Sequence, residues 1–95
     1  MDIPPKLTGI YDEERKKILK QLIEQHEPLL KLCYRHTKGI YEIGLRSYLL
    51  DWEEWVWTAV DCTYQKMVDR HIPLDSFETE LQKVVWPYTN NANDN

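Results

Sequence analysis

The stretch Leu49–His71, LLDWEEWVWTAVDCTYQKMVDRH, decides the fold because it predicts one long helix with an unusually wide apolar surface. Three of the chain's four tryptophans lie in its first half, at positions 52, 55 and 57. Asp51 and Glu54 have the spacing of a capping box, which predicts the helix start. We expect the helix to run to about Arg70, because Pro73 follows. It is therefore the expected centre of the domain.

The apolar residues of this helix fall into two stripes when they are projected at 100° per residue. The first stripe has the width of an ordinary core-facing surface and contains Trp52, Trp55, Val56, Ala59, Val60, Cys62, Thr63 and Met67. The second contains Trp57, Tyr64 and Val68, with Glu53 at its edge. Either neighbouring helices cover both stripes, or the second is partly exposed and binds another protein. The second alternative makes the following residues candidates for partner binding: Glu53, Trp57, Asp61, Tyr64 and Val68.

The sequence before this helix predicts further helices and no sheet. A first helix begins after Asp12, and Pro28 either opens a second helix or kinks a continuous one. Gly39 is a good residue to end that segment. Residues 40–50 are compatible with a short helix weakened by Gly44, and no stretch alternates polar and apolar residues as a strand would.

A last helix is expected to begin at Asp75, because Asp75 and Glu78 repeat the capping-box spacing. Pro87 should end this helix. The fold class is therefore all-α, a single bundle of four to five helices. Residues 1–10 are expected to form a leader, residues 11–88 the helical domain, and the asparagine-rich residues 89–95 a disordered tail.

Composition narrows the class of function. The net charge is −4, with nine Lys/Arg against seven Asp/Glu in residues 1–50 and three against nine in residues 51–95. A basic footprint for nucleic acid over the whole domain is absent. No window has the roughly 18 consecutive apolar residues of a membrane span, and no signal peptide is expected at the N-terminus. We therefore expect a cytoplasmic protein with two reduced cysteines.

Motifs for catalysis or metal binding are not found, so a non-enzymatic protein without cofactor or metal is expected. The Cys and His residues match no common zinc pattern: Cys33, His36, Cys62 and His71. A nucleophile–base pair of Cys33 with His26 or His36 has no further supporting residue.

Two other functions remain open. The first is binding of single-stranded DNA, with unpaired bases stacking on aromatic residues near the C-terminus. The residues for it are Phe77, Lys83, Trp86 and Tyr88. The second is a homodimer in which the second stripe closes a two-fold interface.

Three segments occur in an order that carries a family resemblance. They are residues 26–30 (HEPLL), residues 51–55 (DWEEW) and residues 76–79 (SFET), with Asp69-Arg70 and Pro73 at the junction before the last. This order resembles the second conserved region of bacterial sigma factors, over residues 18–86, and is most similar to short competence-type alternative sigma factors. In that family the acidic-start helix docks on the RNA polymerase clamp, and the last segment opens the helix that melts promoter DNA.

The chain departs from that pattern at residues 56–59 (VWTA). The family usually has a variable residue followed by Gln-Glu-Gly there, so Trp57, Thr58 and Ala59 stand in the place of these three residues. A continued promoter-reading helix and a second DNA-binding domain are not expected either, so a complete sigma factor is not expected. The resemblance implies a sigma-like accessory or regulator of transcription, with RNA polymerase or a transcription regulator as partner. Since Trp57 belongs to the second stripe, that stripe is the expected docking face.

Overall fold

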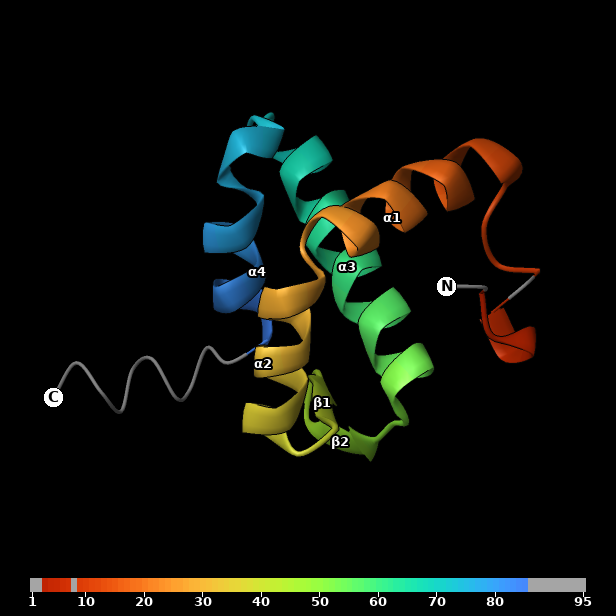
Figure 1. The fold of residues 1–95 in the computed structure, drawn as a ribbon, viewed down its shortest axis with the longest axis vertical. Helices are drawn as coiled ribbons and strands as arrows, with labels where there is room; N and C mark the ends of the chain where they lie inside the picture. Colours follow the sequence, from red (N-terminus) through yellow and green to blue (C-terminus); the bar gives the residue numbers. More distant parts are fainter. Residues whose placement is uncertain (1–2, 8, 86–95) are drawn as a thin grey trace, which may run out of the picture.

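A long central helix, α3 (Trp52–Asp69), organises this computed structural model, which describes residues 3–7 and 9–85. Figure 1 shows α3 crossed by α1 (Glu13–Gln25) and flanked by α2 (Glu27–Thr37) and α4 (Phe77–Val85). Each of these three helices packs against α3. The predicted central position of the tryptophan-rich helix is therefore confirmed.

Two of the three predicted helix starts, at Asp12 and Asp51, are also confirmed, whereas the last helix begins at Phe77 after a 3-10 turn (Leu74–Ser76) that contains Asp75. The Asp12 carboxylate accepts a hydrogen bond from the Arg15 backbone N–H at 2.8 Å, and the Asp51 carboxylate accepts one from the Glu54 N–H at 2.9 Å. Each bond satisfies an N–H that the first turn of a helix leaves without a partner. Of the two alternatives for Pro28, separate helices are correct, because α1 ends at Gln25 and α2 begins at Glu27.

The core lies on several sides of α3. Its residues on this helix are Trp55, Val56, Trp57, Ala59, Val60, Thr63 and Met67. The other helices contribute Leu19, Leu22, Ile23, Leu30, Cys33, Phe77 and Leu81. The first stripe is buried as predicted except at its margins, where Trp52 is half-buried and Cys62 is exposed.

The prediction of an all-α fold without a sheet is wrong. Residues 40–50 contain an antiparallel hairpin of β1 (Ile40–Ile43) and β2 (Arg46–Leu49), with Ile40 opposite Leu49 and Ile43 opposite Arg46. Gly44 has a φ of 62° and Leu45 does not have a positive φ, which is the pattern of a two-residue type II′ turn. A glycine at the first turn position favours this hairpin, whereas the same residue weakens a helix.

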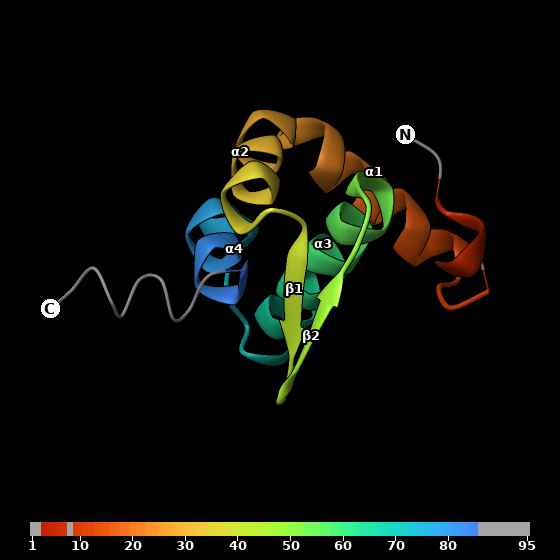
Figure 2. The ribbon, with the colours of Figure 1, turned by 90° about the horizontal axis from the view of Figure 1, so that it is seen from below.

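The hairpin is held against the bundle through β1. Trp55 Nε1 donates a hydrogen bond to the Ile40 carbonyl at 3.3 Å, and the rings of Tyr41 and Trp55 meet edge to face at 6.4 Å. β1 contacts α2 and α3, whereas β2 packs chiefly on β1. Figure 2 shows the turn of the hairpin extending beyond the helices.

An ion-pair cluster joins α3 to α4 at Glu80, whose side chain is buried. Lys66 Nζ lies 3.0 Å from one Glu80 oxygen, and Lys83 Nζ lies 3.3 Å from the other. The hydrogen bond from Lys66, with the weaker effect of Lys83, holds the pKa of Glu80 below its ordinary value, although burial opposes this shift. The carboxylate is therefore the form that the folded protein stabilises.

We expect Glu80→Gln to lower the free energy of unfolding at pH 7, and we expect this loss to shrink as the pH falls. A folded-state pKa below the unfolded value adds stability above the unfolded pKa, and this stability is lost as the pH falls through the folded pKa. Urea unfolding of both proteins between pH 3 and pH 7 measures the difference. The pairing would be refuted by a difference between wild type and variant that does not change with pH.

Candidate protein-interaction surface

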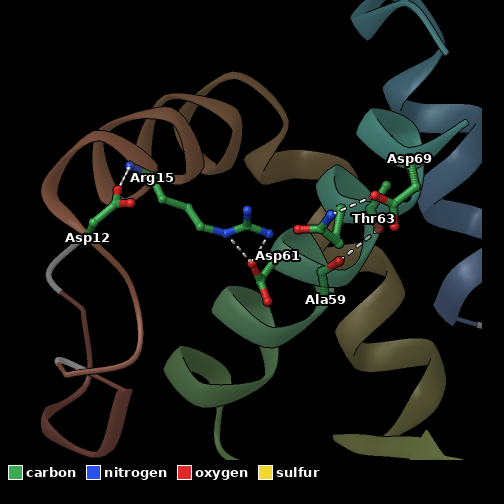
Figure 3. Close-up of polar contacts among 7 residues, drawn as sticks. Asp12, Arg15, Ala59, Asp61, Thr63 and Asp69 are labelled. Atoms are coloured by element: carbon green, nitrogen blue, oxygen red, sulfur yellow. Dashed lines mark hydrogen bonds and ion pairs between the residues drawn. The ribbon is translucent and has the colours of Figure 1, made fainter. Parts of the chain in front are cut away.

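The proposed partner-binding face of α3 is not an open surface, and the prediction that Trp57 is partly exposed is wrong. Trp57 is 1% exposed. Arg15 on α1 reaches across to α3, where its guanidinium pairs with Asp61 at 2.6 Å and lies 5.2 Å from the centre of the Tyr64 ring. Figure 3 shows Arg15 spanning this gap between the helices. α1 crosses this side of α3, and neighbouring elements cover the second stripe at Trp57, whereas Val68 at its end stays exposed.

The members of the second stripe that stay exposed do not form a patch. Glu53 lies in the first turn of α3 and Val68 in the last turn. Fifteen residues of α-helix separate them, or about 22 Å at 1.5 Å per residue. Asp61 and Tyr64, which lie between them, are half-buried and engaged with Arg15. The helix face therefore offers no continuous apolar contact area.

The candidate residues for single-stranded DNA are not brought together on the described surface. Phe77 is fully buried and stacks on the His26 ring at 4.7 Å, so it has no free face for a base. Lys83 is paired with Glu80. Trp86 and Tyr88 lie outside the described residues. Nothing in the described part of the chain favours this function.

The thiols do not form a reactive centre. Cys33 is buried on α2, and its burial raises the pKa of the thiol to about 11, so it is protonated near neutral pH. Cys62 is exposed on α3. Within residues 3–7 and 9–85, no three His, Cys, Asp or Glu side chains are placed to hold a metal ion. The helices of this part are also too short or too polar to cross a membrane.

The exposed apolar surface gathers instead on the hairpin. Large apolar side chains with at least two-fifths of their area exposed occur there at Ile40, Ile43, Leu45, Tyr48 and Leu49. Leu49 is 81% exposed, and Leu45 at the turn is fully exposed. These five side chains belong to one ten-residue segment, whereas the other exposed apolar residues are scattered over the chain. A concentration of this kind marks an interaction site more often than isolated exposed residues do.

The two edges of the hairpin differ in how their backbone groups are satisfied. The Leu50 N–H donates to the Gly39 carbonyl at 2.9 Å, so these two residues form a hydrogen-bonded pair at the base of the ladder. Because such pairs alternate along antiparallel strands, the N–H and C=O groups of Ile40 and Glu42 point away from β2. The Ile40 carbonyl accepts the Trp55 indole N–H. The edge of β1 is therefore partly covered by α3.

The same alternation leaves the outer edge of β2 open. The backbone groups of Ser47 and Leu49 point away from β1. No hydrogen bond joins them to another group among the described residues. All four residues of β2 are exposed. We refer to the backbone groups of Ser47 and Leu49, with the side chains of residues 45–49, as the outer edge of β2.

The hairpin keeps a defined position because its base is anchored. Tyr41 is the buried residue of β1, and burial is the main cause of the rise in its pKa, with the neighbouring Cys62 second. The phenol is thus neutral, as its apolar position requires. The hairpin that carries the outer edge of β2 is therefore fixed to the helices at its base, while its turn extends beyond them.

Sequence reasoning missed this surface because it treated residues 40–50 as a short helix. The signal was present: two four-residue segments, IYEI and RSYL, flank Gly44-Leu45. Two short runs that contain β-branched and aromatic residues, separated by two residues with a leading glycine, are typical of a hairpin with a type II′ turn. Comparison of the chain with protein-family models, curated proteins and solved structures gives no match.

Proposed function

We propose that this chain is a non-enzymatic protein-interaction module that takes up an extended polypeptide strand along the outer edge of β2. The observation that carries the proposal is an apolar edge strand whose outward N–H and C=O groups, at Ser47 and Leu49, have no partner among the described residues. In strand addition, such main-chain groups supply affinity and the alternating side chains supply specificity.

The composition of the strand supports this proposal. Sheets of monomeric proteins usually protect their edges with lysine, proline, a bulge or a covering element. β2 (RSYL) carries Arg46 but neither lysine nor proline, and its pairing with β1 has no bulge. Leu45, Tyr48 and Leu49 are exposed beside it. An edge protected only by Arg46 and by the short length of its strand is suited to being covered by another chain.

The setting that we propose is transcription in the cytoplasm, where the module would act as a sigma-like accessory or regulator within a complex of RNA polymerase or a transcription regulator. Support comes from the order of the three segments that resemble sigma factors. Asp51 caps α3 and residues 76–79 lie at the start of α4, as the resemblance implies, whereas residues 26–30 follow the end of α1 and continue into α2.

Site-specific photocrosslinking in the native cell tests the interaction surface. A photoreactive amino acid at position 49 should give one defined crosslinked product, whose components are identified by mass spectrometry. Ser47→Pro in the same chain should abolish it, because proline removes an outward N–H and places its ring on the outer edge of β2. Lys20, exposed on α1, is the control position. Equal products from positions 49 and 20, or none from 49, would refute the proposed function.

A further inference from the structure

We infer that the strand taken up by the outer edge of β2 is β2 of a second copy of this chain, so that two hairpins form a continuous four-stranded sheet. This inference rests on the proposed function and adds the identity of the partner. Three features of the hairpin support it: its register, its charges and its small size.

The register of β2 is self-complementary. If two β2 strands run antiparallel about a two-fold axis at Tyr48, Ser47 of one copy lies opposite Leu49 of the other. These are the residues whose N–H and C=O groups point outward, so both pairs would exchange hydrogen bonds. Tyr48 would then face Tyr48 of the second copy in a non-hydrogen-bonded pair, where Cα atoms are about 4.5 Å apart. An interface of this kind is isologous, as in most homodimers.

The charges around β2 complement one another in the same register. Arg46 is exposed and makes no ion pair among the described residues. The axis at Tyr48 places it opposite Leu50 of the second copy, immediately before the acidic start of α3. Asp51 and Glu53 of that helix are exposed. Each Arg46 would therefore approach two carboxylates, and the contact occurs twice by symmetry.

The size of the hairpin gives the third argument. An isolated two-stranded sheet is marginally stable in water and needs further strands or packing against a helix. In this hairpin the packing on helices falls chiefly on β1, so β2 is the strand that gains from a further neighbour. Ile40 and Leu49 lie opposite each other on one face of the hairpin and are both exposed. Joining two copies would bring two such pairs onto one face of a four-stranded sheet. The dimer thus covers apolar area that the single chain leaves in water.

Sedimentation equilibrium over a range of concentrations tests the dimer with a matched pair of proline variants. Ser47→Pro should weaken dimerisation by at least about 30-fold, because each of the two symmetric Ser47 N–H groups loses a hydrogen bond of about 1 kcal/mol, and the clash of the proline rings adds to this loss. Glu42→Pro makes the same change at an outward N–H on the edge of β1 and should leave the dimer intact. Near-ultraviolet circular dichroism checks that Trp55 keeps its packing in both variants. Equal weakening by the two folded variants would overturn the inference.

A disulfide at the axis gives an independent measurement that does not depend on proline. In a Cys62→Ser background, Tyr48→Cys should form a disulfide-linked dimer on mild oxidation, since residues at the axis lie within the Cα separation that a disulfide spans. Glu42→Cys on β1 should form no disulfide-linked dimer under the same conditions. A wild-type chain that stays monomeric up to about 1 mM, the concentration that detects even a millimolar dissociation constant, would overturn the inference. If position 49 still crosslinks to a different protein in the cell, the proposed function would stand without the dimer.

Discussion

Trp57→Ala is expected to reduce the free energy of unfolding by about 3–5 kcal/mol, the range for removing a large aromatic side chain from a core. Trp57 is 1% exposed and lies in the middle of the core residues of α3. Domains of this size have total free energies of unfolding of about 5–15 kcal/mol. The variant should therefore keep only part of its stability and unfold at a much lower urea concentration. Urea unfolding followed by circular dichroism measures the loss. A variant destabilised by less than about 1 kcal/mol would show that the indole is not a core residue.

A more conservative substitution, Trp57→Phe, tests what the buried indole N–H of this residue contributes to stability. Trp57 Nε1 is buried and has no hydrogen-bond partner among the described residues, and a buried polar group in that state costs about 1–3 kcal/mol. Trp57→Phe removes this N–H together with part of the ring, so the two effects oppose each other. We expect the variant to lose less than about 1.5 kcal/mol of stability.

Trp55→Phe is the matched control, because it removes the same atoms from the same helix two residues earlier. There the indole N–H donates to the Ile40 carbonyl at 3.3 Å. The substitution breaks this bond and loosens β1 from α3, so it should cost about 1–2 kcal/mol more than Trp57→Phe. The reverse order would mean that the Trp57 N–H has a partner in solution and that the Trp55 contact contributes little.

The helical part of the fold could be predicted from the sequence because its signals are local. Asp12 and Asp51 each accept a hydrogen bond from the backbone N–H three residues later. Pro28 lies in the first turn of α2. Cap chemistry of this kind depends on neighbours in the chain and on little else. The central position of α3 followed from apolar residues at helical spacing over eighteen residues.

The exposure of the second stripe could not be predicted in the same way. Whether Trp57 faces solvent depends on the path of α1, and this path is marked by contacts between residues far apart in sequence. Arg15 and Asp61, which pair across 46 positions, are an example. Periodicity identifies which residues share a side of a helix, but it does not say which other element covers that side.

The candidate site was missed for a different reason, since its signal was short. β1 and β2 have four residues each, and the burial pattern of β2 shows no alternation because all its residues are exposed. Alternation of polar and apolar residues appears only when one face of a strand is buried. A strand whose residues are all exposed lacks that pattern, and only the turn residues Gly44 and Leu45 indicate it.

Gly39→Ala is expected to detach the base of the hairpin and to lower the free energy of unfolding by about 2–3 kcal/mol. Gly39 has a φ of 78°, and an added Cβ would lie 2.9 Å from the Leu50 carbonyl oxygen, a backbone atom. The left-handed conformation alone costs a residue with a side chain about 1–2 kcal/mol. Relief of the contact requires movement of Leu50, whose N–H donates to the Gly39 carbonyl. The base pair of the ladder would then be weakened as well.

Gly44→Ala provides the comparison, because Gly44 also has a positive φ, of 62°, but nothing lies within 4 Å of the added Cβ. It should carry only the backbone penalty of about 1–2 kcal/mol. Near-ultraviolet circular dichroism should report a changed environment of Trp55 in Gly39→Ala and an unchanged one in Gly44→Ala. Hydrogen exchange at the Leu50 amide should accelerate strongly in the first variant alone. If both variants behaved alike, the hairpin would be fixed by its turn rather than by its junction with α2, and the outer edge of β2 would not have the rigid base that strand addition requires.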